Sequence, residues 1–382
     1  MLDFLRKIKK PKYETLNRIE IDKNNLIYNY NYLKSLQPNS EIWPVLKSNA
    51  YGHGLKQVCQ ILNETGCPKI VVDSFPEAQI AYKYFKKKVL LLGEAAVDSY
   101  KYCNFKKTEF IVYNLETISK LVDLDKETKI HIFVNTGMNR EGVSLENIDK
   151  VITAVKKHKN IQVIGLCSHL ASADEISDLN EKQIENFLLF LEKLKKEGID
   201  PEYKHLCNSA GIFISKNNIF NSFRVGLSFY GYNPLKAEHP LFETAKKLKP
   251  AFDVFSKITS VQNTKKGDKV SYNETFESDE DTRIATIPFG YYEGLDRRYS
   301  NKISFQIRQK EAVLTTRIAG RVCMNLTSLD CQKKSIQTGD MVNIISSNTK
   351  APNSIQNIAS EIKTIPYEIL VGFKENIRRK IV

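Results

Sequence analysis

The chain has 382 residues, of which 42% are hydrophobic and 26% charged, and its formal net charge at pH 7 is +13. This composition excludes the disordered class, and the length favours a large barrel plus a second domain, or two mid-sized domains, over one ordinary core. No apolar run approaches the roughly 20 residues that cross a bilayer, and the first residues lack the apolar core of a signal peptide, so we expect a cytoplasmic protein without a membrane segment.

The positive charge raises the alternative of a nucleic-acid-binding surface, because Lys and Arg contacts to phosphate dominate that affinity. The lysines are spread among acidic residues, however, as in residues 192–197 (Glu-Lys-Leu-Lys-Lys-Glu). Since mixed-sign stretches of this kind usually face water, we expect a solvated, lysine-rich surface and no nucleic-acid partner. The seven cysteines include no Cys-x-x-Cys pair, a pattern that predicts neither a metal site nor a disulfide framework.

Short strand-like runs alternate with longer amphipathic stretches from about residue 17 onward. Residues 42–46 precede a predicted helix over 54–64, and residues 69–72 precede another over 74–85. Further buried parallel strands are predicted at 88–93, 130–134 and 163–167. This repetition predicts a (β/α)₈ TIM barrel over residues 15–250.

After about Pro250 the strand candidates lie closer together, at 253–261, 282–287 and 341–345. Gly-Asp turns punctuate this part of the chain, at 266–268 and 338–340. We therefore predict a mainly β C-terminal domain over residues 251–382, with residues 1–20 as a candidate segment to pack with it. The predicted fold class is α/β: a TIM barrel followed by a mainly β C-terminal domain.

Lys47 stands where chemistry is expected in such a fold. It follows the apolar residues Val45 and Leu46, and the carboxyl ends of barrel strands carry the active site in enzymes of this architecture. A lysine amine at such a place can form a Schiff base with a carbonyl group. The alternative is an ordinary surface lysine.

Residues 45–54 (Val-Leu-Lys-Ser-Asn-Ala-Tyr-Gly-His-Gly) resemble the cofactor-lysine signature of the alanine racemases. The resemblance continues in the same order through residues 136–142 (Thr-Gly-Met-Asn-Arg-Glu-Gly), 168–169, 208–210, 224–231, 290–294, 320–324 and 366–368. It covers the chain from about Ile19 to the C-terminus. It implies an enzyme that uses pyridoxal 5′-phosphate to interconvert L- and D-alanine, usually to supply D-alanine for the peptidoglycan cell wall, and that works as a head-to-tail homodimer with shared active sites.

The resemblance also implies roles for particular residues. Lys47 and Tyr291 of the partner subunit would be the catalytic pair, because moving a proton from one face of Cα to the other needs an acid/base group on each face. The matching cofactor-binding residues are Lys47, Tyr51, His169, Ser209, Arg224, Gly226, Leu227 and Tyr367. The matching substrate-binding residues are Arg140 and Met324, and no metal is expected.

Arg224 matches the residue that hydrogen-bonds the pyridine nitrogen of the cofactor. An arginine there donates a hydrogen bond without giving up its proton, so the ring is a weaker electron sink than an acid would make it. That property favours clean reprotonation of the substrate. Ordinary structural roles remain as alternatives for three matches: a surface ion pair for Arg224, core packing for Met324, and a hydrogen-bonded core histidine for His169.

Several positions depart from the commonest pattern of the family. Phe133 stands where many members carry a carbamylated lysine that helps to hold the arginine matching Arg140. The usual glycine, leucine, aspartate and Ala-Asp are replaced by Asn139, Glu141, Asn325 and Tyr292-Glu293. These changes concern substrate orientation and the entrance. They leave a serine or broad-specificity racemase as the alternative, because a small apolar pocket rejects an extra hydroxyl only weakly.

Two other functions compete with racemisation. A pyridoxal-phosphate amino-acid decarboxylase also has a barrel and a β domain, but the chain lacks the Gly-rich phosphate loop and the cysteine-centred motif of those enzymes. A non-enzymatic carrier of the cofactor consists of the barrel alone, and the C-terminal domain with Tyr291 argues against it.

Overall fold

A computed structural model describes residues 13–216, 218–309, 312–332 and 334–382. The chain divides into two compact units. The barrel unit comprises Asp22–Ala251 with Ile381–Val382, and the β unit comprises Phe252–Lys380 with the described part of Met1–Ile21. Within these described ranges, no helix combines the length and the apolarity that spanning a membrane requires.

Parallel strands form the inner wall of the barrel unit. Six of those described are hydrogen-bonded in chain order: β3 (Lys69–Val72), β4 (Lys88–Leu91), β5 (Thr108–Val112), β6 (Thr128–Phe133), β7 (Ile161–Cys167) and β8 (Tyr203–His205). Strand β2 (Glu41–Pro44) pairs with β9 (Ser222–Val225). The ring closes because Leu46 N–H donates to the Val71 carbonyl (2.7 Å) and Arg224 N–H donates to the Cys207 carbonyl (3.2 Å). The predicted eight-stranded barrel is confirmed.

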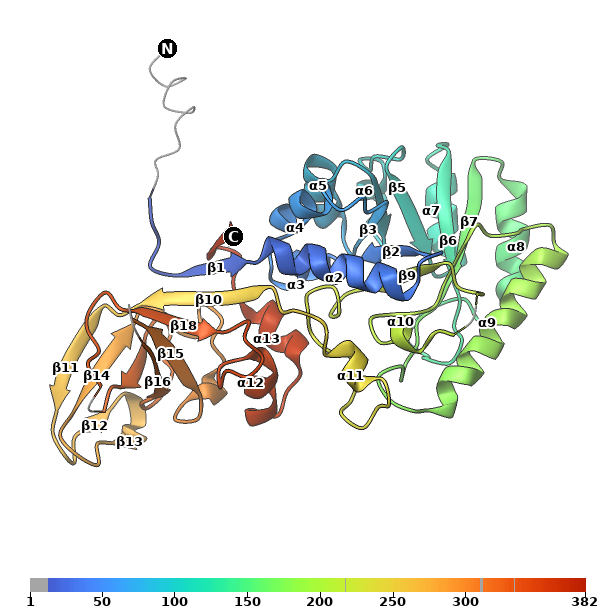
Figure 1. The fold of residues 1–382 in the computed structure, drawn as a ribbon. Helices are drawn as coiled ribbons and strands as arrows, with labels where there is room; N and C mark the ends of the chain where they lie inside the picture. Colours follow the sequence, from blue (N-terminus) through green and yellow to red (C-terminus); the bar gives the residue numbers. More distant parts are fainter. Residues whose placement is uncertain (1–12, 217, 310–311, 333) are drawn as a thin grey trace, which may run out of the picture. The chain divides into compact units, whose positions relative to one another are not determined.

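Helices lie on the outside of these strands (Figure 1). Helix α2 (Lys23–Leu36) precedes β2, and β2 to β9 are followed in turn by α4 (Leu55–Leu62), α5 (Phe75–Tyr84), α6 (Val97–Tyr100), α7 (Leu115–Val122), α8 (Ile148–Lys157), α9 (Asp178–Lys196), α10 (Gly211–Ile214) and α11 (Phe242–Ala245). The helices predicted at 54–64 and 74–85 correspond to α4 and α5. Every residue of β3 and of β5 is buried, because helices cover the outer face and side chains fill the inside.

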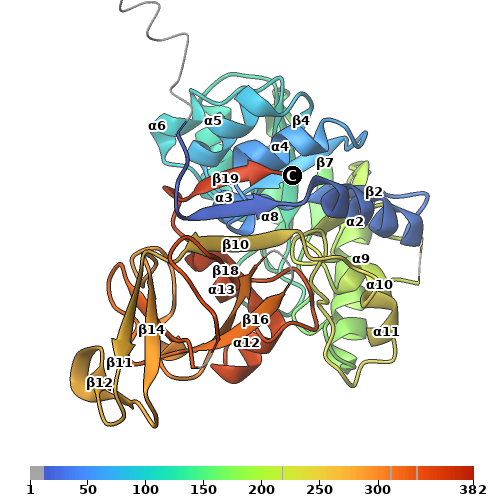
Figure 2. The same cartoon turned by 60° about the vertical axis from the view of Figure 1, so that its left-hand side comes forward.

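The β unit is built on a sheet of nine described strands. In sheet order these are β11 (Ser260–Thr264), β14 (Thr282–Ile287), β17 (Thr327–Asp330), β16 (Val313–Ile318), β15 (Ser304–Arg308), β18 (Met341–Ile345), β10 (Phe252–Lys257), β1 (Arg18–Ile21) and β19 (Arg378–Ile381). Smaller elements are β12 (Lys269–Val270), β13 (Phe276–Glu277), η1 (Tyr272–Glu274) and η2 (Arg297–Tyr299). Helices α12 (Ile355–Glu361) and α13 (Pro366–Gly372) lie together beside the sheet (Figure 2).

The prediction of a single strand over residues 253–261 was wrong. The run 253–261 is two strands, β10 and β11, which have different neighbours: β10 pairs with β18, and β11 pairs with β14. The change of neighbour falls at Ile258 and Thr259, whose N–H groups donate to the carbonyls of Asp340 and Thr286. The predicted strands at 282–287 and 341–345 match β14 and β18.

A left-handed turn, α3 (Lys47–Tyr51), follows β2. Ser48, Asn49, Ala50 and Tyr51 all have φ between 51° and 54°. This conformation costs an L residue about 1–2 kcal/mol. Side-chain acceptors hold the turn in place, because Ser48 N–H donates to Glu77 Oε1 (2.6 Å) and Leu55 N–H donates to Asn49 Oδ1 (2.8 Å).

Glu77 is expected to stabilise this turn. Its second oxygen accepts from Asp73 N–H at 2.8 Å, so both carboxylate oxygens are used. In a Glu77→Gln variant one oxygen becomes an NH₂ group that faces a backbone donor. We expect a loss of about 1–2 kcal/mol in the free energy of unfolding. Urea unfolding followed by the fluorescence of buried Trp43, the chain's single tryptophan, measures this loss.

The matched control is Glu116→Gln on α7. Glu116 forms an exposed pair with Lys120 at 3.0 Å, and such pairs contribute little to stability. Hydrogen exchange at residues 48–52 should quicken in Glu77→Gln alone. Equal stability and equal exchange in the two variants would show that Glu77 does not hold the turn.

Candidate active site

The predicted site residues of the barrel unit gather at one end of the barrel. Lys47 and Tyr51 follow β2, Arg140 follows β6, His169 follows β7 and Ser209 follows β8. Arg224 is the third residue of β9, and Gly226 and Leu227 come directly after it. Since the strands are parallel, their carboxyl ends share one end of the barrel, where barrel enzymes place their chemistry.

Hydroxyl and amide groups converge after β9. Ser209 Oγ accepts hydrogen bonds from the N–H groups of Gly226 (2.9 Å) and Ser228 (3.3 Å). A Cβ atom at Gly226 would lie 2.4 Å from the Tyr51 hydroxyl, so only glycine fits at this position. Because Ser209 Oγ accepts from two amides, its O–H is left to donate, and hydroxyls such as those of Ser209 and Tyr51 are groups suited to a phosphate.

Arg224 lies inside the barrel and is 4% exposed. Its Nη1 donates to Nδ1 and to the carbonyl oxygen (2.9 Å) of His205, and its Nη2 donates to the Ser168 carbonyl. Nη2 also lies 3.4 Å from His169 Nδ1. The surface ion pair that was the alternative for Arg224 is therefore wrong.

His169 is surrounded by positive charge. Burial is the largest cause of a fall in its pKa to about 3. The cations of Arg224, Arg140 and Lys47 lower this pKa further. The imidazole is consequently neutral at physiological pH, so it accepts or donates hydrogen bonds without adding another charge.

Arg140 has a carboxylate partner next to it in the chain. Its Nε and Nη2 donate to Glu141 Oε1 at 3.1 and 2.7 Å. Phe133 packs against the Tyr113 ring, with centroids 5.1 Å apart, and a Cβ at Gly142 would lie 2.8 Å from its Cδ1. Phe133 thus packs between Tyr113 and Gly142, and Glu141 supplies a hydrogen-bond acceptor for Arg140.

Asn139 is a further departure with a physical reason. Its φ is 58°, in the left-handed region that asparagine tolerates better than most non-glycine residues. The side chain of Asn135 holds this loop, because its Oδ1 accepts from Asn139 N–H (3.1 Å) and its Nδ2 donates to Asn139 Oδ1 (2.9 Å). Asparagine therefore preserves the backbone that glycine would adopt.

Tyr291 and Met324 lie on two adjoining loops of the β unit. Tyr291 N–H donates to the Cys323 carbonyl (3.0 Å), and Tyr292 N–H donates to the Met324 carbonyl (2.9 Å). Tyr291 is 43% exposed and Met324 is 56% exposed. Because Met324 is exposed in the single subunit, core packing, the alternative role for Met324, is wrong there.

Two of the departures brace these loops. Glu293 Oε2 accepts from Gly290 N–H (2.8 Å), and its Oε1 accepts from Asn325 Nδ2 (2.9 Å).

Tyr367 lies in the first turn of α13 and is 37% exposed. A Cβ at Gly294 would lie 2.6 Å from the Gly372 carbonyl oxygen, so the loop of Tyr291 approaches the end of α13 closely.

Sequence reasoning missed three groups that shape this site: His205, Ser228 and Glu77. His205 ends the short strand β8, where it follows the half-buried residues Tyr203 and Lys204, so no alternation of polarity marked it. Ser228 lies inside the motif at 224–231 and was overlooked because its amide, not its side chain, faces Ser209. Glu77 lies in α5, where an acidic residue in the first turn of a helix is common.

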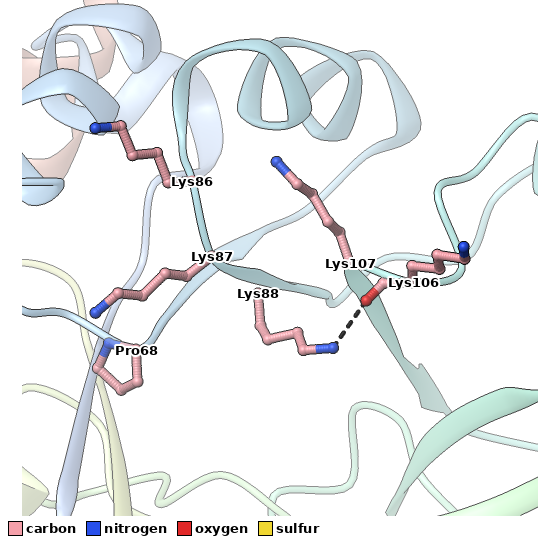
Figure 3. A pocket seen from close by; sticks show the side chains of 6 residues that line it. All are labelled: Pro68, Lys86, Lys87, Lys88, Lys106 and Lys107. Carbon is pink, nitrogen blue, oxygen red and sulfur yellow. Dashed lines mark hydrogen bonds between the residues drawn. The ribbon is translucent and has the colours of Figure 1, made fainter.

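A hollow of about 430 Å³ at the amino-terminal end of the barrel strands is lined by Pro68 and by Lys86, Lys87, Lys88, Lys106 and Lys107. Figure 3 shows their ammonium groups pointing in different directions. Three of them donate to main-chain carbonyls: Lys87 to Gly66, Lys88 to Lys106, and Lys107 to Phe85. The lysines do not converge on a common point, and we assign them no ligand.

Comparison with known proteins finds matches to both units of the chain. Residues 21–234 match the model of the alanine racemase N-terminal domain, and residues 251–381 match that of the C-terminal domain. An alanine racemase of Borreliella burgdorferi is 34% identical over 371 residues, covering 95% of this chain and 96% of that protein. One of Leptospira interrogans is 31% identical over 375 residues, covering 95% of each.

A solved alanine racemase of Clostridium difficile is similar in structure as well. It has a TM-score of 0.87 and 27% identity, and the match covers 97% of each chain. The predicted family and the predicted fold are thus confirmed, and the match over both domains excludes a carrier that consists of the barrel alone. This chain belongs to the alanine racemase family.

Proposed function

We propose that this chain interconverts L- and D-alanine with pyridoxal 5′-phosphate carried on Lys47. The observation that carries the proposal is the donor set after β9, where Gly226 leaves room for the Tyr51 hydroxyl and Ser209 faces two backbone amides. This set fits a phosphate dianion, and Lys47 begins the turn that carries Tyr51.

The other cofactor-binding roles follow the same arrangement. Tyr51, Ser209, Tyr367 and the amides of Gly226 and Leu227 would hold the phosphate. Arg224 would donate to the pyridine nitrogen, and neutral His169 would lie against the ring. When bound, the cofactor supplies an electron sink that spreads negative charge from the substrate Cα over its ring.

Lys47 and Tyr291 of the partner subunit would divide the proton transfers between them. Racemisation removes a proton from one face of Cα and returns one to the other face, so each face needs its own acid/base group. The Lys47 amine would act on the face that carries the proton of D-alanine. The Tyr291 phenol would act on the face that carries the proton of L-alanine.

Arg140 and the amide of Met324 would hold the substrate carboxylate. An arginine suits this task because its planar group of N–H donors matches two carboxylate oxygens. The carboxylate of Glu141 would keep Arg140 in position, the task that a carbamylated lysine at 133 performs in other members. Serine, or a range of small amino acids, is the alternative substrate, since a small pocket rejects an added hydroxyl only weakly.

A homodimer is part of the proposal. The β unit exposes large apolar side chains on the segments that carry the predicted site residues, namely Tyr291, Tyr292, Met324, Leu326, Ile365, Tyr367 and Val371. Exposed apolar patches of this kind mark protein–protein contacts. A second copy of the chain would cover them and bring Tyr291 to the partner's Lys47.

A cytoplasmic location is proposed as well. All seven cysteines are free thiols, and six of them are buried. Burial raises the pKa of Cys59, Cys67, Cys167 and Cys207 to about 12, so these thiols are unreactive. Free thiols are usual in a reducing compartment.

Subunit mixing tests the proposed function. Lys47→Ala and Tyr291→Phe should each be inactive as pure proteins. Mixing them under conditions that exchange subunits should restore racemisation of alanine, because one of the two sites in a mixed dimer combines an intact Lys47 with an intact Tyr291. Activity is measured by the loss of optical rotation of L-alanine and, in parallel, of L-serine.

Mixing two preparations of Lys47→Ala that carry different affinity tags serves as the control for exchange. If the tags show that subunits have exchanged and no activity returns, the shared site is refuted. Faster racemisation of serine than of alanine would favour the alternative substrate.

A further inference from the structure

A continuous line of polar side chains crosses the interior of the barrel. Lys69 Nζ lies 2.5 Å from Glu109 Oε2, the same oxygen lies 3.1 Å from His131 Nε2, and His131 Nδ1 lies 2.9 Å from His205 Nε2. His205 Nδ1 faces Arg224 Nη1. All five residues are at most 4% exposed, so the line is closed off from solvent.

The direction of each hydrogen bond in this line follows from Arg224, the residue at one end of it. A guanidinium has only donors, so His205 Nδ1 must present its lone pair to Arg224. The proton of neutral His205 is then on Nε2, and it is donated to His131 Nδ1. The proton of His131 is consequently on its Nε2, which donates to the Glu109 carboxylate.

The charges within the line agree with these directions. Burial lowers the pKa of His131 to about 4 and that of His205 well below its usual value, so both rings are neutral at pH 7. Burial alone would raise the pKa of Glu109, but the hydrogen bond from His131 and the charge of Lys69 lower it to about 2. Glu109 is therefore an ionised carboxylate, which can accept the hydrogen bond that His131 Nε2–H donates.

The surrounding core is shaped to the line. A Cβ at Gly165 on β7 would lie 1.8 Å from His131 Nδ1, so glycine makes space for this ring. Lys69 Nζ lies 3.9 Å from the centre of the Trp43 ring and 3.7 Å from that of Tyr203, both within cation–π range. These contacts and Glu109 offset part of the cost of burying the ammonium group, although burial still lowers the pKa of Lys69.

We propose that Glu109 and Lys69 are positioning residues for Arg224: through His131 and His205 they fix the ring tautomers that turn an acceptor toward the guanidinium. The inference rests on the proposed function for what Arg224 then does, which is to donate to the pyridine nitrogen. The hydrogen-bond directions themselves depend only on the barrel.

Removing the acceptor at residue 109 should reverse the whole line. One carboxylate oxygen of Glu109 faces both Lys69 Nζ and His131 Nε2, so the oxygen of a glutamine amide could serve both donors, and the informative change is the double variant Lys69→Met/Glu109→Leu. In this variant an N–H group at His131 Nε2 would be buried without an acceptor, so we expect His131 to carry its proton on Nδ1 and His205 to do the same. His205 would then oppose Arg224 with an N–H group, and the guanidinium would lose one acceptor.

The test is ¹⁵N NMR of the purified holoenzyme labelled at its six histidines, with single His→Gln variants to assign His131 and His205. We expect the proton of both rings on Nε2 in the unmodified protein from pH 6 to 9. We expect the proton on Nδ1 of both rings in Lys69→Met/Glu109→Leu. In Lys69→Met/Glu109→Gln the amide oxygen can again accept from His131 Nε2–H, so the Nε2 tautomers should return.

Activity should follow the tautomers. We expect kcat/KM for alanine to fall about tenfold in Lys69→Met/Glu109→Leu, the lower end of what loss of an outer-shell hydrogen-bond partner costs, and to recover in Lys69→Met/Glu109→Gln. Thr108→Val is the matched control. It removes the hydrogen bonds of Thr108 Oγ1 with the Tyr82 hydroxyl (2.6 Å) and the Asn104 carbonyl (2.8 Å), one residue from Glu109, and should leave tautomers and activity unchanged.

An Nδ1 proton on either ring of the unmodified protein would overturn the inference, as would Nε2 tautomers that persist in Lys69→Met/Glu109→Leu. If that variant does not fold, the tautomers of the unmodified protein and of Lys69→Met/Glu109→Gln still decide the matter. Failure of the proposed function has a different signature, because an unmodified protein that does not racemise alanine would still report its tautomers.

Discussion

The structure of the predicted site depends on the burial of one permanent cation, the Arg224 guanidinium, inside the barrel. Removing such a charge from water is tolerated only when it is well hydrogen-bonded. Because arginine can only donate, every neighbour must accept, and the carbonyls of Ser168 and His205 and the ring of His205 do so. These groups come from the ends of β7 and β8, next to β9 in the closed barrel, so the topology itself makes the arrangement possible.

Around this cation the backbone adopts conformations that few residues accept. The turn after Lys47 is left-handed over four residues. Glu77 accepts from the Ser48 amide of this turn, and the Asn49 side chain accepts from the Leu55 amide at the start of α4. Asn139 adopts a left-handed conformation on the loop that leads to Arg140. Departures from the family pattern at such positions keep the backbone or the charge pairing, which explains how the chain differs in residues while remaining within the family.

The sequence predicted the barrel well because its strands are continuous apolar runs between amphipathic helices, as parallel strands covered on both faces must be. The same property kept the sequence from indicating the line of polar side chains from Lys69 to Arg224 inside the barrel. In β6, for example, Lys129 is exposed and His131 is buried although both alternate with isoleucines, so the pattern did not separate an inward polar side chain from a surface one. The break between β10 and β11 was missed because both strands and the residues between them share a strand-like composition.

The residues assigned to the site came from the family motifs and not from periodicity. Motifs place Lys47, Arg224 and Tyr291 without any knowledge of the fold, but they contain no information about residues outside them. Glu77 and Glu109 contact the motif residues only through the three-dimensional structure, directly at Ser48 and through two histidines at Arg224. Contacts of this kind can be identified only from a three-dimensional structure.

The central claim is that Lys47 and Tyr291 serve opposite faces of one substrate. It is tested most directly by following the exchange of the Cα hydrogen in deuterated water for L-alanine and D-alanine separately, in the unmodified holoenzyme and in Tyr291→Phe. The account predicts that Tyr291→Phe slows exchange of L-alanine by about 10²–10⁴, the usual contribution of a positioned acid/base group, and slows that of D-alanine far less. Equal losses for the two enantiomers, with the cofactor still bound, would contradict it.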